Sequence, residues 1–487
     1  MQTRRDQVVA HNFMVGRLGT AMLEADPDAI DAPMQRTRRG AFIGLAIAAL
    51  LCVGFLVFGL IFPGGNTSWR TEGALVLERE TGATYLYSGG VLRPVANYAS
   101  ARLVQGSQMT VRSVSADSLA GVPKGGPVGI PGAPDSLPDA ETMSSALWRV
   151  CAVPPAQEDG EPRTALSIDA TPDDGALPTE FAVLVEGPDN DHHLLWNGTR
   201  LRLDEENGAL QALGYGTSPA RSVSRAFLDS VPSGGDLAAP EVPGGVGEQS
   251  PEIGGERRVT GQVFVVRGDG DADQYYLLGG GGLVPVSAVQ SRLALADTRI
   301  TDDAYGDAAP EPVALNAADV QRNLAENAAA IDDGLPVTPP EPAATDGQAP
   351  CMRVSADGDA QLVLHPLEAV SAWPVQDRPH TAHGCPTADL IGIPAGTGAI
   401  VRAEPTGGSA SDPTYYLVTD AATKYPLPSA DTAGELGYSA EAAARVPTSL
   451  LRLLPTGPLM SAEAAAQPVP ATAAPPAAAG CGEREGT

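Results

Sequence analysis

The 487-residue chain carries 31 Lys and Arg against 59 Asp and Glu, so its formal net charge is −28. This charge argues against a nucleic-acid-binding protein, because no surplus of cations is available to displace counterions from phosphates. The 55 glycines and 44 prolines, with only 5% aromatic residues, predict many turns, long loops and short strands.

The first strong element in chain order is the apolar segment 41–62, which holds 22 residues without a charged side chain. As an α-helix it would span about 33 Å, enough to cross a bilayer. A buried core helix is the alternative, but such a helix normally has a polar stripe, which this segment lacks. The segment is longer than a cleavable signal peptide's apolar region and begins about 40 residues from the N-terminus, so we interpret it as a signal anchor.

The charges on either side of this segment predict its orientation in the plasma membrane. Arginines within residues 36–39 precede it, whereas Arg70 on the other side is offset by Glu72. Positive charge favours the cytoplasmic side, so the N-terminus is predicted to be cytoplasmic and the C-terminal body extracytoplasmic.

The cytoplasmic segment 1–40 has apolar residues at roughly helical spacing. A helix of this length is marginal alone, so it should either lie on the inner membrane face or dock against another membrane protein. We favour docking. The candidate contact residues are Val8, Phe13, Val15 and Leu18.

Four segments beyond the anchor share one order of features. Each has an apolar strand, a polar turn, a strand with paired large residues, a second turn, and a third strand that leads into a short helix. Most also end in a short apolar helical pattern followed by Pro-x-Gly, which indicates a helix and its stop. Each repeat is predicted to be a small three-stranded sheet with helices on one face, and neighbouring repeats should bury one another's apolar surfaces. The first to fourth repeats are residues 73–138, 180–245, 258–345 and 397–461.

Two segments do not fit the repeat, residues 139–175 and 346–396. Each contains an apolar strand with a cysteine, then a turn and a second strand, and they lie at equivalent places between repeats. The simplest arrangement joins them as one central β-domain in which Cys151 pairs with Cys351. Such a bond would close a loop of about 200 residues and contribute about 5 kcal/mol in the chain-entropy model. The fold class is therefore α+β, with one transmembrane helix and an elongated body of four β/α repeats around a central β-domain.

The remaining cysteines divide between the membrane and the exported side. Cys52 lies in the anchor, where it should behave as a small apolar residue. The four exported cysteines lie in a compartment that permits disulfides, and they allow three pairings. Cys481 belongs to the Ala/Pro-rich tail 462–487, whose composition predicts disorder. Cys385 and Cys481 form a second candidate pair.

The run Leu92–Leu103, which reads LRPVANYASARL, is the most specific motif in the chain. Together with the RRDQV sequence near the N-terminus, the anchor and the four repeats, it resembles the EccB family, a membrane-core component of actinobacterial type VII (ESX) secretion systems. The resemblance covers nearly the whole chain. It implies a repeat body around a central β-domain with a disulfide, again Cys151 to Cys351. The acidic insertion at 297–312 and the tail with Cys481 depart from the family pattern.

The resemblance also implies partners and a role. Members act with other core subunits, including a motor ATPase and a polytopic channel protein, in a membrane complex that exports small helical effector pairs. We predict a non-catalytic structural subunit that self-associates, scaffolds assembly and stabilises the extracytoplasmic side of the export channel. Outside the membrane, the candidate contact residues are Pro94, Asn97, Tyr98 and Arg102, for which ordinary packing of the first repeat is the alternative.

Nucleotide hydrolysis is sometimes attached to this family, but the sequence lacks its usual signature. A phosphate-binding loop needs Gly-x-x-x-x-Gly-Lys-Ser/Thr, and neither Lys124 nor Lys424 follows that motif. The glycine run 279–282 lies between two predicted strands, where a hairpin turn explains it.

Two metal-binding patterns are also incomplete. Residues 269–273 resemble the start of a calcium loop, but Gln274 and Gly280 occupy positions that need Gly and Glu. Residues 380–385 contain two histidines and a cysteine, yet no pattern for a fourth zinc ligand lies nearby. We therefore predict no catalytic residue, no cofactor and no metal. The alternatives for the whole protein are a membrane-anchored hydrolase, which would need a cleft with convergent titratable side chains, and a cell-wall-binding module.

Overall fold

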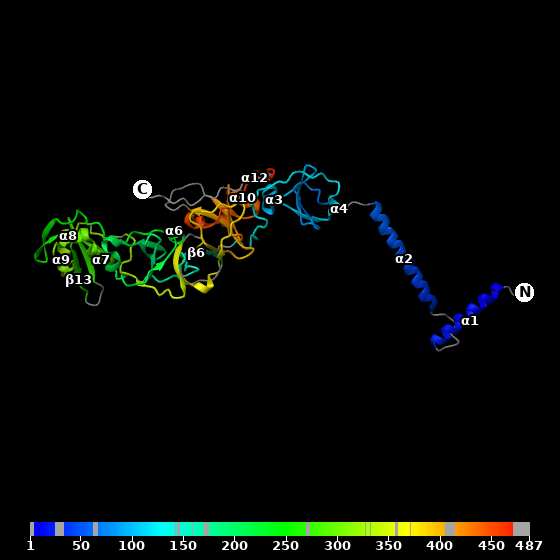
Figure 1. Ribbon diagram of the computed structural model, residues 1–487, viewed down its shortest axis with the longest axis horizontal. Helices are drawn as coiled ribbons and strands as arrows, with labels where there is room; N and C mark the ends of the chain where they lie inside the picture. The colour runs from blue at the N-terminus through cyan, green and yellow to red at the C-terminus, as the bar shows by residue number, and fades with distance from the viewer. Residues whose placement is uncertain are drawn as a thin grey trace. The chain divides into compact units, whose positions relative to one another are not determined.

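The computed structural model describes residues 4–24, 34–61, 67–141, 143, 147–157, 159–169, 175–268, 273–326, 328–331, 333–355, 359–370, 372–404 and 414–470 (Figure 1). The chain divides into two compact units. Unit 1 comprises Met1–Arg70, Glu78–Thr81 and Ser113–Gly121, and unit 2 comprises Thr71–Leu77, Gly82–Arg112 and Val122–Thr487.

Unit 1 contains two long helices, α1 (Arg4–Glu24) and α2 (Met34–Ile61). Within α2, residues Thr37–Gly59 have a mean hydropathy of 2.8, and none of this stretch is buried. A helix of this length extends about 35 Å, so α2 is long and apolar enough to cross a membrane. The predicted span 41–62 falls on α2, except that Phe62 lies outside the described residues.

Each repeat contains the predicted meander of three antiparallel strands, but a short fourth strand joins it beside the first strand. In the second, third and fourth repeats this added strand pairs in parallel with the first. The prediction of three-stranded sheets was therefore wrong. In the first, second and fourth repeats the short helix pattern itself is correct, because Ser115, Ser224 and Pro447 are N-cap residues, but a strand precedes each of them.

The first two repeats are built from the following elements. The first contains β1 (Leu75–Glu78), β2 (Thr84–Ser88), β3 (Val91–Pro94), α3 (Tyr98–Gln105), β4 (Val111–Val114) and α4 (Ala116–Leu119). The second contains β7 (Phe181–Glu186), β8 (His192–Trp196), β9 (Thr199–Arg202), η1 (Glu205–Asn207), α5 (Ala209–Ala212), β10 (Arg221–Ser222) and α6 (Arg225–Ser230).

The last two repeats are longer. A separate two-stranded sheet of β11 (Gln249–Ile253) and β12 (Glu256–Val259) precedes the sheet of the third repeat. The third repeat then contains β13 (Val263–Val266), β14 (Gln274–Gly279), β15 (Gly282–Val286), α7 (Ala288–Ala296), α8 (Thr298–Tyr305), β16 (Val313–Ala314), α9 (Ala317–Asn323) and β17 (Glu341–Pro342). The fourth contains β22 (Gly398–Glu404), β23 (Tyr415–Thr419), β24 (Thr423–Leu427), α10 (Ala430–Leu436), η3 (Ala440–Ala442), β25 (Ala444–Pro447) and α11 (Thr448–Arg452), followed by α12 (Ala462–Ala466).

The third repeat differs from the others at its acidic insertion and at its end. The acidic insertion contains an extra helix, α8, which begins where the buried Asp297 carboxylate accepts the N–H of Arg299 at 2.8 Å. Its final strand, β17, leaves the repeat and pairs in parallel with β7 of the second repeat. The two repeats are therefore joined by backbone pairing as well as by side chains.

In every repeat, the tail of the repeat approaches the backbone of the third strand, which is the other edge of the sheet. The third strand forms a parallel bridge to the tail of its own repeat, at Leu92 with Lys124, Arg200 with Ser233, Leu283 with Leu324, and Lys424 with Thr456. In three repeats the bridged tail residue is the x of Pro-x-Gly. A Cβ on Gly457 would overlap the Tyr425 ring, so this glycine is needed for close approach. In the third repeat Ala325 stands in its place and Gly282 lies opposite, where a Cβ would come within 2.6 Å of the Asn323 carbonyl oxygen.

The two non-repeat segments form one six-stranded sheet with strand order β19-β18-β5-β6-β21-β20. β5 and β18 pair antiparallel, which places Cys151 directly opposite Cys351. The elements are β5 (Leu147–Val153), β6 (Arg163–Asp169), β18 (Gln348–Val354), β19 (Ala360–Pro366), η2 (Leu367–Ala369), β20 (Trp373–Pro374) and β21 (Leu390–Gly392).

The repeats pack in two pairs, the first with the fourth and the second with the third, so only one pair joins neighbours along the chain. Leu103 of α3 and Leu436 of α10 share one buried cluster, which joins the first and fourth repeats. Leu213 and Leu293 share another, which joins the second and third. A third cluster joins the central sheet to the second and fourth repeats, for instance through Phe227 of α6. Each small sheet thus buries its helices against a partner, which a repeat of this size requires.

One short motif occurs once in each of the two pairs of repeats. Leu-Gly-Tyr follows the helix after the third strand in the second and fourth repeats, and each glycine has positive φ, 91° at Gly214 and 97° at Gly437. The Tyr215 hydroxyl donates to the Pro340 carbonyl at 2.8 Å, and the Tyr438 hydroxyl donates to the Pro138 carbonyl at 2.7 Å. Burial raises the pKa of Tyr215 to about 12. Each tyrosine thus holds the chain that leaves the partner repeat.

The predicted disorder of the tail is wrong at its start. Residues 462–466 form α12, which packs against α3 of the first repeat. Beyond it, the Val469 N–H donates to the Pro127 carbonyl at 3.0 Å, and the Gln467 carbonyl accepts the N–H of Gly129 at 3.2 Å. These contacts explain the order, because the chain gains backbone hydrogen bonds and a buried alanine face. Residues 471–487 lie outside the described part of the chain.

Candidate functional site

The predicted cytoplasmic contact residues lie on α1. Val8, Phe13, Val15 and Leu18 are each more than half exposed. At about 100° per residue, these side chains and the exposed Met14 spread around the helix instead of forming one stripe. A helix that lies flat on a membrane needs a single apolar face, so this distribution is better matched by enclosure among protein helices.

Asn97, one of the candidate contact residues outside the membrane, is buried and makes hydrogen bonds within the chain. Its side chain is 6% exposed. Its Oδ1 accepts the N–H of Ser100 at 2.9 Å, which caps α3, and its Nδ2 donates to the Ile130 carbonyl at 2.7 Å. Asn97 therefore fits the packing alternative rather than a surface contact.

The other three residues of this group also make contacts within unit 2. The Pro94 carbonyl accepts the N–H of Val128, and Tyr98 packs against the apolar cluster of the first repeat. Arg102 lies beside Gly437 in the fourth repeat, where a Cβ would come within 2.8 Å of its Nη2. A contact of these side chains with another subunit stays a prediction.

We expect Asn97→Ala to lower the free energy of unfolding of the body by about 2 kcal/mol, because it removes a helix cap and leaves the buried Ile130 carbonyl without this donor. Asn316→Ala is the matched control, since Asn316 caps α9 by accepting the N–H of Asp319 at an exposed site. Its cost should be about 1 kcal/mol. Denaturant unfolding of both variants measures the difference, and equal costs would contradict the internal role of Asn97.

Cys151 and Cys351 form a disulfide between adjacent central strands. Both are buried, and Ala165, Val363 and Leu390 pack around them. Cys385 is also disulfide-bonded, but its predicted partner Cys481 lies outside the described residues, so that pairing stays a prediction. Cys52 is a free cysteine on α2.

The chain's two lysines are both used structurally. Lys424 is buried, and its ammonium group donates to the Leu454 carbonyl at 2.6 Å. Burial lowers the pKa of Lys424 to about 8. The Lys124 Nζ lies 4.9 Å from the centroid of the Tyr85 ring. The predicted hairpin turn at the glycine run is confirmed, because Gly279 pairs with Gly282 between β14 and β15.

The first incomplete metal pattern covers residues 269–273. Residues 269–272 lie outside the described ranges. In the other pattern, the His383 Nε2 lies 2.9 Å from the Asp377 carboxylate. Across the described residues, no group of three or more His, Cys, Asp or Glu side chains is placed to hold a metal ion.

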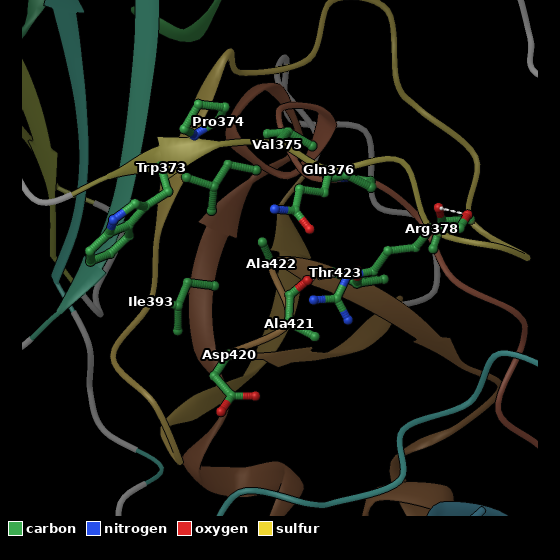
Figure 2. Close-up of a pocket in the computed structure, with 13 residues that line it drawn as sticks. Trp373, Pro374, Val375, Gln376, Arg378, Ile393, Asp420, Ala421, Ala422 and Thr423 are labelled. Atoms are coloured by element: carbon green, nitrogen blue, oxygen red, sulfur yellow. Dashed lines mark hydrogen bonds between the residues drawn. The ribbon is translucent and has the colours of Figure 1, made fainter.

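Sequence reasoning missed one polar hollow on unit 2, shown in Figure 2. Gln376 and Arg378 line it from the segment between β20 and β21, Trp373 lies at its rim on β20, and Asp420 lines it from the turn between β23 and β24. These two segments are far apart in the sequence and neither carries a motif, so no sequence signal could have brought them together.

One apolar helix followed by four related α/β sheets and a disulfide-bonded central sheet defines a single-pass membrane protein with a repeat body. Residues 1–473 match the sequence model of the family described as "Type VII secretion system ESX-1, transport TM domain B". The chain therefore belongs to the EccB family of type VII secretion systems. The resemblance noted in the sequence, and the α+β fold class, are confirmed.

Curated relatives and solved structures agree with this assignment. The chain is 28% identical to "ESX-3 secretion system ATPase EccB3" of Mycolicibacterium smegmatis, over 94% of this chain and 89% of the relative. It is 27% identical to "ESX-1 secretion system ATPase EccB1" of Mycobacterium tuberculosis, over 95% and 94%. A chain in an intact ESX-5 inner membrane complex matches with a TM-score of 0.63 at 24% identity, over 98% of both chains. A chain of the EccB3 dimer from the ESX-3 core complex matches with a TM-score of 0.62 at 24% identity, over 81% of this chain and 100% of that one.

Proposed function

We propose that this protein is a structural subunit of an ESX inner membrane complex, which it anchors through α2 and scaffolds through unit 2 on the extracytoplasmic side of the export channel. The observation that carries the proposal is the family match over residues 1–473, which includes α1, the anchor and all four repeats. The exposed apolar residues of α1 supply a second contact surface on the opposite side of the membrane.

Two features support the proposed orientation, with a cytoplasmic N-terminus and an extracytoplasmic body in the plasma membrane. Arginines within residues 36–39 stand at the N-terminal end of α2, and positive charge is retained on the cytoplasmic side. The body contains a disulfide, which persists in oxidising compartments outside the cytoplasm.

The proposed partners are further copies of this chain and the other core subunits, including the motor ATPase and the polytopic channel protein. One solved relative is described as a dimer from a core complex and another as part of an inner membrane complex. These descriptions support self-association and assembly by this chain.

The names of the relatives also contain the word ATPase, so nucleotide hydrolysis is the rival function. It would need a cation beside the phosphates. Lys424 is buried on a backbone carbonyl and Lys124 lies over a tyrosine ring, so neither lysine is placed for that role. ATP turnover by the purified chain would favour the rival function.

Replacing Val8, Phe13, Val15 and Leu18 together by alanine should lower the yield of assembled complex at least about tenfold, because it removes apolar contacts while alanine keeps α1 helical. Native gels and mass spectrometry of detergent extracts measure the yield. The control is Gln7→Ala with Asn12→Ala, which changes polar side chains of the same helix and should leave assembly unchanged. A normal complex yield from the apolar variant would contradict the docking role of α1.

A further inference from the structure

A groove of two adjoining hollows lies where residues 373–381 pass the turn between β23 and β24. The smaller hollow has a volume of about 210 Å³ and the larger about 650 Å³. Both are lined by Arg378, Thr381, Asp420 and Ala421, so they are continuous. The groove lies entirely within unit 2.

Two polar side chains, Gln376 and Arg378, line the smaller hollow. Figure 2 shows the Gln376 amide and the Arg378 guanidinium group pointing into it. Neither side chain has a hydrogen-bond or ion-pair partner among the described residues. Asp420 is fixed in place, because its Oδ2 accepts the N–H of Gly396 at 2.7 Å. The turn that carries Arg378 is fixed by Thr381, whose hydroxyl donates to the Arg378 carbonyl at 2.8 Å.

The other side of the same hollow is apolar. Ile391 and Ile393 are buried residues that contribute to its wall. Trp373 stands on the rim and is 65% exposed. It lies on β20, the last strand of the central sheet, opposite Ile391 on β21. The hollow thus combines an amide and a guanidinium group with a small aliphatic wall, and the exposed Trp373 indole and the Asp420 carboxylate lie at its rim.

We propose that this groove binds a neutral glycan that carries N-acetyl groups. An indole face stacks on the C–H face of a sugar ring, and planar amide, guanidinium and carboxylate groups each bond neighbouring hydroxyl or amide groups. The isoleucine wall receives the acetyl methyl group. The smaller hollow lies below the range of about 300–1,000 Å³ typical of drug-sized ligands, so it suits a single sugar ring, and the larger hollow has room for the rings that follow.

Charge and strand geometry argue against other ligands. The net charge of −28 repels anionic polymers but leaves a neutral one unaffected. Beside this groove the edge strand of the central sheet is β20, which is two residues long and contains Pro374. Proline has no N–H to donate to an added strand. Recognition here must therefore proceed through side chains.

The test uses the full chain in a detergent without a sugar headgroup. Isothermal titration should show saturable binding of chitotetraose, an oligomer of N-acetylglucosamine. Cellotetraose, which lacks the acetyl groups, should bind about tenfold more weakly. Trp373→Ala and Gln376→Ala should each weaken chitotetraose binding about tenfold. Val337→Ala, which changes an exposed apolar residue outside the groove, should not.

Absence of saturable chitotetraose binding by the unmodified chain, or unchanged binding by Trp373→Ala, would overturn the glycan site. Loss of co-purifying secretion subunits from Trp373→Ala, with no sugar binding by the unmodified chain, would identify a protein contact and would overturn it too. The inference rests on the proposed function only for placing unit 2 outside the cell. Complex yield is measured separately, so a failed glycan site and a failed scaffold role give different results.

Discussion

Replacing Cys151 and Cys351 together by alanine is expected to lower the free energy of unfolding of the body by up to about 5 kcal/mol, the largest stability effect anticipated for this chain. The bond joins residues 200 positions apart, and the closed loop contains the whole of the second and third repeats. Without it, the unfolded chain gains the entropy that the cross-link removes. Long loops often deliver less than the chain-entropy value, so about 3 kcal/mol would still agree.

The variant should nevertheless fold, because the two strands are held together by more than the bond. β5 and β18 remain paired from Cys151 with Cys351 to Trp148 with Val354, and Trp148 and Met352 lie in the large cluster of the central sheet. Guanidinium unfolding of the full chain, followed by tryptophan fluorescence, measures the change. Cys52→Ala is the control, since Cys52 is a free cysteine outside unit 2. A loss below about 1 kcal/mol would show that the unfolded chain is already compact across the loop.

The repeat order and the two segments of the central sheet could be read from the sequence because they depend on local patterns. An apolar strand, a turn and a second strand leave a signal within about 25 residues. The fourth strand leaves none. β10 and β16 are two residues long, and they pair in parallel with strands that lie 36 and 49 residues earlier in the chain.

The sequence did not predict which repeats pack together, for a different reason. Each repeat has a helix with an apolar face, so α3 could pack as well against one partner as another. The Leu-Gly-Tyr motif was a usable signal, because it occurs in the second and fourth repeats, whose tyrosines hold the chain that leaves the third and first. Asn97 carried a signal as well. Asn with Ser three residues later at the start of a helix is typical of an N-cap, and it favoured the internal role over a contact surface.

The Pro-x-Gly motif has two structural roles. It was interpreted as a helix stop, and in the structure the glycine also allows the tail to approach the third strand of the same repeat. None of Gly125, Gly234 and Gly457 has positive φ, so backbone conformation does not require them. These glycines are needed because a side chain would not fit between the tail and the third strand. In the third repeat the tail has Ala325 instead, and the glycine is on the facing strand, at Gly282.

Gly457→Ala should therefore lower the free energy of unfolding by about 3 kcal/mol, because the added methyl group would overlap the ring of Tyr425. That ring is buried in the cluster shared by the first and fourth repeats, so it has little room to move. The tail would shift from β24 and weaken the hydrogen bond from the Gly457 N–H to the Lys424 carbonyl, now 2.8 Å. Denaturant unfolding measures the cost, and hydrogen exchange at Gly457 locates it.

Gly434→Ala is the matched control in the same repeat. Gly434 lies inside α10, and a Cβ there would meet nothing within 4 Å. Alanine is the better helix former, so this variant should be stabilised by about 0.5–1 kcal/mol. The same substitution is thus expected to act in opposite directions at two glycines of one repeat. If both variants were stabilised, the tail would have space to spare at Gly457, and close approach could not be the reason that glycine recurs in the repeats.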